Sequence, residues 1–500
     1  MATTNVLLNE QKENFQYGST FKNYINGEWV PSISGEISPS INPGNIQEVL
    51  GYFQKSNVED VQAAIKSAKD SFLAWSKTSV IKRGDVLFNL IYLLEQEKEE
   101  LATLITKEVG KTIKAARLEV EASIQALKHF SGEANRLAGE TVPANDPNTF
   151  TCTIKEPLGV VAVVTPFNFP LGIGIYKIAP AILAGNTVIF KPASDTSLVG
   201  VKTVELFVKA GIPKGVLNLI TGPGSVIGQE FSDNKEIKAV SFTGSSEIGI
   251  ALGRAVTSRG AKMQAEMGGK NATIILEDAD IEQAVKGVVT SGFINNGQSC
   301  TGTSRLIVPR SIAKKVTELL VKEASAINVG DGFAEEVHNG AVANEQQLKT
   351  YLHYVKTAID EGATLEYGGE KLTDLNREKG YFVSPTVFSG VNKNMTIAKE
   401  EIFGPVVAVM EVENYNEAID LANDIEFGLS SAIYTNDLEK AFYFIRQIET
   451  GVTHVNIPSN HYENQLPFGG KKDSSIGPRE QGSTALDFWV ETKAVYIKPY

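Results

Sequence analysis

The segment that decides the fold spans residues 159–194 and reads GVVAVVTPFNFPLGIGIYKIAPAILAGNTVIFKPAS. Two short runs rich in β-branched residues, GVVAVVTP and NTVIFKP, enclose a longer apolar stretch that begins near Pro170. Neither short run alternates between apolar and polar residues, which is typical of strands that are buried on both faces of a parallel sheet. The segment therefore predicts a strand–helix–strand unit of an α/β protein.

The same pattern continues after this segment. GVLNLIT and AVSFTGS read as further strands, and helices are expected to begin near Thr196, Ser225 and Ser245. A second α/β series runs from ATIIL at residue 272 to HVNIP at residue 454. We therefore divide the chain near Glu266–Gly269 and expect ligands to bind beyond the carboxyl ends of the strands.

The regions that flank this α/β core have different sequence patterns. Upstream, Ser56 and Glu59 fit a helix-capping box, and a largely helical region follows as far as Ala138. FTCTIKE at residues 150–156 alternates like a half-exposed strand, and the tail DFWVETKAVYIKPY at residues 487–500 also reads as extended. We expect these two segments to pair, either within one chain or between subunits.

The composition excludes several classes of protein. In 500 residues, 47 Lys and Arg against 59 Asp and Glu give a net charge of −12, so nucleic acid is not an expected partner. Five His and two Cys make neither a disulfide framework nor a convincing zinc site, and no metal is expected. A signal peptide and a membrane helix of ~18 residues are not expected either, so we predict a cytoplasmic protein with free thiols.

The two cysteines stand in different contexts. Cys152 lies in the middle of FTCTIKE, where a cysteine is usually a small buried hydrophobe. Cys300 lies in NGQSCTGT at residues 296–303, a polar turn bounded by glycines. Backbone N–H groups in such a turn could stabilise a thiolate and an adjacent oxyanion, and the thiolate would attack an electrophilic carbon.

A cysteine nucleophile needs a catalytic partner. The histidines form no recognisable pairing motif with Cys300, although His454 and His461 could lie close together in space. Glu266 in AEMGGKN is a more suggestive partner, because a carboxylate there could activate water to hydrolyse an acyl-thioester. The alternative is a solvated surface carboxylate, and the spacing alone leaves both interpretations open.

Several other segments are candidate ligand contacts. GPGSVIG at residues 222–228 has one residue too many for GxGxxG, so a plain αβ turn is an equally good interpretation. The Gly-Ser turn in FTGS at residues 242–245 opens a helix and forms a ready anion site. Residues 110–112 (GKT) match half of a P-loop, but Ile105 stands where the first glycine is needed. Lys191, at the end of NTVIFKP, is either a solvated lysine or a contact to a ligand hydroxyl or phosphate.

Seven motifs, taken in order, resemble those of the aldehyde dehydrogenase superfamily. They are PFNFP at 166–170, KPAS at 191–194, FTGS at 242–245, EMGGKN at 266–271, GQSC at 297–300, EEIFGP at 400–405 and PFGGKKDS at 467–474. The likeness extends from about Phe21 to the last residues. Each motif alone is modest support, whereas seven in the order of the family make the resemblance specific.

The resemblance implies an α/β fold with a Rossmann-type cofactor domain, an α/β catalytic domain and a small β extension that builds homodimers or homotetramers. The cofactor domain would comprise residues 21–142 and 160–266, and the catalytic domain residues 267–480. The β extension would comprise residues 143–159 and 481–500, and residues 1–20 would form a polar N-terminal arm.

The resemblance also implies the catalytic roles. Cys300 would be the nucleophile, and the side-chain amide of Asn168 would bind the oxyanion together with the backbone N–H of Cys300. An aldehyde would pass through a thiohemiacetal and a thioester to the carboxylic acid, with transfer of a hydride to NAD(P)+. Glu266 would activate the hydrolytic water, and its presence favours a free acid over the product of the CoA-acylating branch.

The expected cofactor site draws on residues from both halves of the chain. Glu401 would hold the nicotinamide ribose and Lys191 the adenosine ribose. Many NAD-preferring relatives carry an acidic residue at the position of Ser194, so NADP is expected to be tolerated or preferred alongside NAD. The complete set of expected cofactor contacts is Thr165, Pro166, Phe167, Lys191, Ser194, Gly224, Phe242, Thr243, Gly244, Ser245, Ile248, Gly268, Glu401 and Phe403.

Within the superfamily, the chain is similar to the α-ketoglutaric semialdehyde (2,5-dioxovalerate) dehydrogenases. The similarity lies in IKEPLGVVAVVTPFNFP, in CTGTSR and in the tail SSIGPREQGSTALDFWVETKAVYIKP. Succinic semialdehyde relatives often carry an Arg six residues before the nucleophile, where this chain has Ile294. Arg305, Asn460 or His461 would then hold a substrate carboxylate, or the substrate is an uncharged aldehyde.

Other functions stay open at this point. Within the family, the alternatives are a broad-specificity aldehyde dehydrogenase and a succinic semialdehyde dehydrogenase. Outside it, a cofactor-independent thiol esterase could use the same Cys300 and Glu266. A non-catalytic homologue is disfavoured by the intact set of Asn168, Glu266, Cys300 and Glu401.

Overall fold

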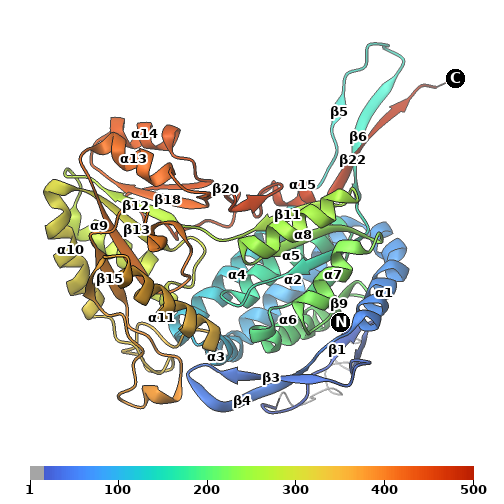
Figure 1. The fold of residues 1–500 in the computed structure, drawn as a ribbon. Helices are drawn as coiled ribbons and strands as arrows, with labels where there is room; N and C mark the ends of the chain where they lie inside the picture. Colours follow the sequence, from blue (N-terminus) through green and yellow to red (C-terminus); the bar gives the residue numbers. More distant parts are fainter. Residues whose placement is uncertain (1–15, 500) are drawn as a thin grey trace.

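The computed structural model describes residues 16–499, and Figure 1 shows two large α/β units with one narrow arm that projects from them. The expected α/β fold is confirmed. The segment 159–194 forms β7 (Val160–Val164), α5 (Pro170–Ala184) and β8 (Thr187–Lys191), as its pattern predicts. Residues 1–15 of the predicted N-terminal arm lie outside the described residues.

The first sheet has eight strands. Their spatial order is β2 (Glu28–Val30), β1 (Asn23–Ile25), β9 (Leu217–Leu219), β8, β7, β10 (Ile237–Thr243), β11 (Lys262–Glu266) and β21 (Ser475–Ile476). From β7 the parallel order runs to β8 and β9 on one side and to β10 and β11 on the other. Such a reversal opens a crevice at the carboxyl ends of the strands, here between β7 and β10.

Helices cover both faces of this sheet. They are α1 (Val58–Lys77), α2 (Val80–Gln96), α3 (Lys98–Val109), α4 (Ile113–Glu133), α5, α6 (Ser197–Lys209), α7 (Gly224–Asp233) and α8 (Ser246–Ser258). In β7, Val161 and Val163 pack with α2 to α6, while Val160 and Ala162 pack with α1, α7 and α8. Burial on both faces explains why the strand sequence shows no alternation.

The capping box of α1 lies one residue later than predicted. Asn57 Oδ1 accepts from the backbone N–H of Asp60 at 3.1 Å, and Asp60 Oδ2 accepts from the backbone N–H of Asn57 at 3.0 Å. The prediction of Ser56 as the cap is therefore wrong. Ser56 is held before the helix, because its backbone N–H donates to Thr221 O at 3.1 Å and its hydroxyl accepts from Asn23.

The second sheet has seven strands. Their spatial order is β14 (Thr364–Tyr367), β15 (Thr386–Ser389), β16 (Val406–Val412), β13 (Thr303–Pro309), β12 (Asn271–Ile275), β18 (Ser430–Tyr434) and β19 (Val452–Val455). Its helices are α9 (Ile281–Gly292), α10 (Arg310–Ser325), α11 (Glu345–Asp360), α12 (Thr396–Lys399), α13 (Tyr415–Asn423) and α14 (Leu438–Gln447). The chain passes between the two sheets at residues 267–270. It returns to the first sheet at β21, inside the range predicted for the catalytic domain.

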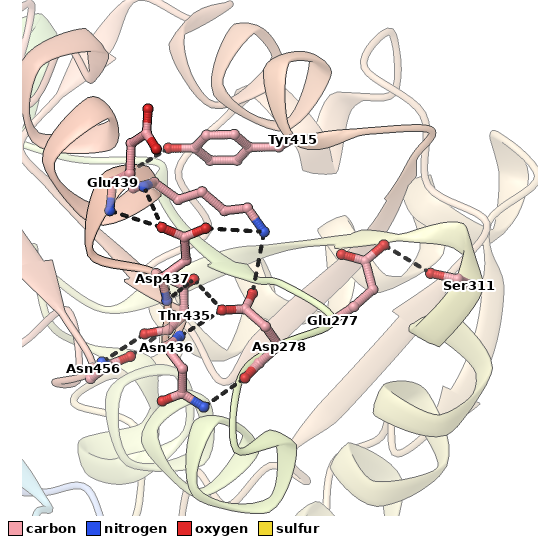
Figure 2. A network of polar contacts seen from close by, with 10 residues as sticks. Glu277, Asp278, Ser311, Tyr415, Thr435, Asn436, Asp437, Glu439 and Asn456 are labelled. Carbon is pink, nitrogen blue, oxygen red and sulfur yellow. Dashed lines mark hydrogen bonds and ion pairs between the residues drawn. The ribbon is translucent and has the colours of Figure 1, made fainter.

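A polar network joins the end of β12 to the segment that follows β18 (Figure 2). Asp278 Oδ2 accepts from Thr435 Oγ1 and from the backbone N–H of Asn436, each at 2.7 Å. Asn456 Nδ2 donates to Thr435 O at 2.9 Å, which extends the network to the end of β19. These bonds fix β12, whose first residue, Asn271, contacts the loop of the predicted nucleophile.

The arm is a three-stranded sheet of β5 (Thr141–Val142), β6 (Phe150–Pro157) and β22 (Val490–Ile497). β22 pairs antiparallel with β6 along its whole length, from Val490 opposite Pro157 to Ile497 opposite Phe150. The expected pairing of the two extended segments thus occurs within one chain, and Figure 1 shows the sheet projecting away from both large units. β5 adds two residues to the arm just before the predicted start of the extension at 143.

Smaller elements complete the fold. They are the hairpin of β3 (Ile37–Asn42) and β4 (Asn45–Gln54), the pair of β17 (Phe427–Gly428) and β20 (Lys471–Lys472), and the short helix α15 (Ala485–Phe488). Among residues 16–499, the helices are too short or too polar for any of them to traverse a lipid bilayer.

Candidate active site

A cleft of about 910 Å³ lies at the carboxyl ends of β7 and β10. Its walls include every predicted cofactor residue except Ser194, namely Thr165, Pro166, Phe167, Lys191, Gly224, Phe242, Thr243, Gly244, Ser245, Ile248, Gly268, Glu401 and Phe403. Cys300 and Asn168 line the same cleft. Residues that lie far apart in the sequence therefore meet in one site of a size that suits an organic cofactor.

The cleft offers groups that fit a phosphate-bearing cofactor. α7 and α8 begin at its wall, where Gly224 and Ser245 lie. No side chain within residues 16–499 caps either helix, so the first backbone N–H groups are available to an anion. The hydroxyls of Thr243 and Ser246 are buried without a hydrogen-bond partner in the described chain.

Lys191, at the end of β8, is buried rather than solvated. Its Nζ donates to Pro192 O at 3.1 Å, and its side chain lines the cleft. Burial lowers the pKa of Lys191 to about 8, and the charge of Asp195 opposes this shift. Ser194 is exposed beside the cleft wall, and its hydroxyl donates to Gly222 O at 3.5 Å.

Asn168 lies in the connection between β7 and α5 and is buried. Its Nδ2 donates to Gln298 O at 3.1 Å, in the turn that carries Cys300. An amide nitrogen has two N–H donors, and only this bond is formed within residues 16–499, so the second N–H is available to a ligand. Asn168 therefore links the first sheet to the turn that carries Cys300.

Cys300 follows a turn with a strained backbone. Asn295, Asn296 and Gly297 have φ values of 58°, 55° and 62°, a left-handed run that residues other than glycine rarely adopt. Asn296 Nδ2 donates to Gly340 O and Ala341 O, and Asn271 Nδ2 donates to Cys300 O at 2.7 Å. Side-chain amides thus hold the turn in place.

The surroundings of the Cys300 thiol favour its protonated form. Burial, together with the charges of Glu401 and Glu266, raises the pKa of this thiol to about 12. The backbone N–H groups of Cys300 and Thr301 have the opposite effect, as the glycine-bounded turn predicts, but burial outweighs them. The proton must therefore leave before the sulfur can attack a carbon.

Glu266, the last residue of β11, is buried, so the interpretation as a solvated surface carboxylate is wrong. Ser475 Oγ donates to Glu266 Oε2 at 2.6 Å, whereas Oε1 has no partner within the described chain. Burial and the charge of Glu480 raise the pKa of Glu266 well above its ordinary value. Gly469 makes room for the carboxylate, because a Cβ there would lie 2.4 Å from Oε1.

Glu401 lies against the glycine pair that follows Glu266. The backbone N–H of Gly269 donates to Glu401 Oε1 at 3.0 Å, and a Cβ on Gly268 would lie 2.1 Å from Oε2. Burial raises the pKa of Glu401 to about 7, while this N–H and the ammonium of Lys270 oppose the shift. Gly268 thus leaves room for the Glu401 carboxylate at the cleft wall, and the backbone of Gly269 binds it.

Two other candidates, Arg305 and His454, have their polar groups occupied elsewhere. The nitrogens of Arg305 donate to Lys270 O, Leu421 O and Ala422 O, so it is a structural residue of the second sheet, and its role with a substrate carboxylate is wrong. The ring nitrogens of His454 bond to Ser431 O at 3.0 Å and His461 O at 2.8 Å. His454 and His461 are indeed close, but His454 has no ring nitrogen left to act as a base for Cys300.

Several residues of the cleft wall are not among the predicted contacts. Ser225, Gln229 and Ser232 of α7 line it, as does Gln347 of α11. The α7 residues lie three and four positions apart, so helical periodicity from the predicted start at Ser225 could have found them. Gln347 comes from the second unit, and no local signal marks it. Within residues 16–499, no group of three or more His, Cys, Asp or Glu side chains could hold a metal ion.

One cleft thus brings together a cysteine, an amide and a buried carboxylate, beside the uncapped starts of two helices. The model of the aldehyde dehydrogenase family matches residues 29–495, and the chain belongs to this family. It is 43% identical over 481 residues to the α-ketoglutaric semialdehyde dehydrogenase of Bacillus subtilis, covering 96% of this chain and 99% of that one.

Other comparisons agree. The chain is 42% identical over 476 residues to the α-ketoglutarate semialdehyde dehydrogenase of Haloferax volcanii, covering 95% of this chain and 98% of that one. The crystal structure of an NAD-dependent aldehyde dehydrogenase from Sinorhizobium meliloti matches with a TM-score of 0.93 at 34% identity, covering 98% of this chain and 96% of that one. The predicted class, an NAD(P)-dependent aldehyde dehydrogenase, is confirmed.

Proposed function

We propose that the protein oxidises a semialdehyde to the carboxylic acid, with Cys300 as nucleophile, Asn168 as oxyanion donor and Glu266 as the base for hydrolysis. The observation that supports these roles is their convergence. Cys300 and Asn168 line one cleft, and the charge of Glu266 acts on the Cys300 thiol. NAD(P)+, when bound along the cleft, supplies the acceptor for the hydride.

The proposed reaction uses these groups in turn. Deprotonated Cys300 Sγ bonds to the aldehyde carbon, and the second N–H of Asn168 binds the resulting oxyanion together with the backbone N–H of Cys300. Expulsion of the hydride from that carbon leaves a thioester on Sγ. Glu266 Oε1 then takes a proton from water, the water oxygen bonds to the thioester carbon, and the C–S bond breaks to release the acid.

The expected substrate is α-ketoglutaric semialdehyde, the compound in the names of the two curated relatives. This semialdehyde already carries one carboxylate. The protein therefore needs a polar group that binds that end of the substrate. With Arg305 occupied, Asn460 and His461 remain the candidates, in the loop that follows β19. His461 is half-exposed, and its Nε2 lies 3.5 Å from Glu463.

His461→Ala is expected to raise the KM for α-ketoglutaric and succinic semialdehydes roughly fivefold, the size of a partly exposed polar contact, and to leave pentanal unaffected. Formation of reduced nicotinamide with each aldehyde measures this, and His353→Ala, an exposed histidine on α11, is the control. A preference for pentanal in the wild type would contradict the semialdehyde assignment. Product formation without any dinucleotide would favour the thiol esterase instead.

For the cofactor, we propose that Ser194 admits the 2′-phosphate of NADP as well as NAD. Ser194→Glu is expected to shift the ratio of kcat/KM for NAD over NADP upward by about tenfold, since a carboxylate repels the phosphate and 1.4 kcal/mol corresponds to that factor. Ser194→Gln, which has the same size without the charge, is the matched control. An unchanged ratio in Ser194→Glu would place the 2′-position elsewhere.

We also propose that the arm joins subunits into a homodimer or homotetramer. Val142, Phe150, Ile154, Tyr496 and Ile497 are exposed on it. β5 covers only two residues of β6, so much of the β6 edge is unpaired within the described chain. An exposed apolar sheet with a free edge is a liability in solution unless another chain covers it.

A further inference from the structure

Residues 110–112 (GKT), which do not form a P-loop, connect α3 to α4 and bury a lysine. Gly110 ends α3 with φ of 86°, and Thr112 Oγ1 accepts from the backbone N–H of Ala115 to begin α4. Lys111 between them is only 1% exposed. A lysine is almost never fully buried unless it is paired, so this position has a specific use.

The ammonium of Lys111 contacts the loop that carries the proposed oxyanion donor. Its Nζ donates to the backbone carbonyl of Asn168 at 2.6 Å and lies 4.1 Å from the centroid of the Phe169 ring. It also donates to Glu119 Oε2 at 2.8 Å. Burial lowers the pKa of Lys111, and the charge of Glu119 opposes that shift.

Glu119, on α4, holds the other side of the same loop. Its Oε1 accepts from the backbone N–H groups of Leu171 at 3.0 Å and Gly172 at 3.1 Å, at the start of α5. The residue at the N-cap of α5, Phe169, has no side-chain acceptor, so the carboxylate from α4 takes over the capping. The Lys111–Glu119 pair thus binds a carbonyl and two N–H groups within residues 168–172.

The GKT segment also packs against Gly340, a residue that holds the turn before Cys300. A Cβ on Gly340 would lie 1.8 Å from Gly110 O, which shows how closely the two backbones pack. Gly340 O in turn accepts from Asn296 Nδ2, in the turn before Cys300. The buried lysine therefore lies where the Asn168 loop and the Cys300 turn are both supported.

We propose that Lys111 is a positioning residue for the oxyanion site, because it fixes the Asn168 backbone so that the side-chain amide reaches both Gln298 O and the oxyanion. This inference rests on the proposed role of Asn168. Without the ammonium, the Asn168 carbonyl loses its partner and the loop is free to rotate. A displacement of about 1 Å in a catalytic group costs about 100-fold in rate.

The test is a double-mutant cycle of Lys111→Met and Asn168→Ala, read by single-turnover hydride transfer. Asn168→Ala alone is expected to lower the rate about 10²- to 10³-fold, as the loss of one oxyanion donor does. Lys111→Met alone is expected to lower it about 100-fold. In the Asn168→Ala background, Lys111→Met is expected to have no further effect, because the group that it positions is already gone.

Two readouts separate positioning from general damage. Alkylation of Cys300 by iodoacetamide needs no oxyanion donor, so its rate is expected to be unchanged in Lys111→Met, and so is the Kd for reduced nicotinamide. A normal hydride rate in Lys111→Met, additive losses in the cycle or equally slowed alkylation would overturn the proposal. A normal rate in Asn168→Ala would instead overturn the proposed role of Asn168 itself.

A second mutant cycle tests the proposal if Lys111→Met fails to fold. Removal of one partner of a buried ion pair is strongly destabilising, whereas removal of both charges is often tolerated. Lys111→Met/Glu119→Gln is therefore compared with Glu119→Gln, which keeps the lysine and an acceptor oxygen for α5. The double variant is expected to transfer hydride about 100-fold more slowly than Glu119→Gln, and no more slowly once Asn168→Ala is also present. Equal rates in the double variant and Glu119→Gln would refute the role of Lys111.

Discussion

Cys300→Ala is expected to abolish aldehyde oxidation while the protein still folds and binds its cofactor. Alanine removes the atom to which the substrate carbon bonds, so neither the thiohemiacetal nor the thioester can form. The loss of a covalent nucleophile typically lowers kcat on the order of 10⁶-fold, which brings turnover below detection. The measurement is the absorbance of reduced nicotinamide with aldehyde and cofactor present, and fluorescence titration of the reduced cofactor checks binding.

Cys152→Ala is the matched control for this result. Cys152 lies in β6 of the arm, opposite Val495, and its thiol is free like that of Cys300. Its loss is expected to leave turnover unchanged. Turnover that survives in Cys300→Ala, or that disappears in Cys152→Ala, would show that the nucleophile has been assigned to the wrong cysteine.

Glu266→Gln is expected to produce one reduced nicotinamide per active site and then to stall. In the proposed reaction, the first half uses Cys300 and Asn168, whereas hydrolysis of the thioester uses a carboxylate that accepts a proton from water. The loss of this base is expected to slow deacylation by about 10²- to 10⁴-fold. Stopped-flow measurement separates the burst from the steady rate, and steady turnover at the rate of the burst would contradict the assignment.

The acid limb of the pH profile tests the same carboxylate. Burial and the charge of Glu480 raise the pKa of Glu266, and only the ionised form accepts a proton. Steady-state turnover is therefore expected to fall as the pH drops below this raised pKa, at a higher pH than for an ordinary glutamate. The Ser475 hydroxyl lowers the pKa of Glu266 through its hydrogen bond, so Ser475→Ala is expected to move the limb to still higher pH.

The sequence was most informative where one physical rule acts locally. β7 and β8 are buried on both faces, and this burial alone gives the unbroken apolar runs of GVVAVVTP and NTVIFKP. Boundaries were less certain, because Ser56 and Asn57 both precede an acidic residue by three positions. Only the bond from Ser56 to Thr221, far along the chain, selects Asn57 as the cap.

The site could be predicted as a set of residues but not as an environment. Asn168 follows the carboxyl end of β7, where the rule for parallel sheets places a ligand site. Cys300 and Glu401 line the same cleft but precede β13 and β16 of the second sheet, so only their motifs marked them. The burial and the hydrogen-bond partners of Arg305 depend on residues far along the chain that pack around the second sheet. The motif CTGTSR could therefore not show that the guanidinium of Arg305 already has partners. The use of Lys111 was also hidden, because its contacts lie 8 and 57 positions away in the sequence.

The arm has a consequence for the order of events during synthesis. β22 pairs with β6 along its whole length, from Val490 opposite Pro157. β6 therefore leaves the ribosome more than 300 residues before its partner strand. Domains generally fold as their residues emerge, so both large units have their strands available before the arm can close. The surface that we propose to join subunits is thus the last part of the chain to be completed, after the residues of the cleft have been synthesised.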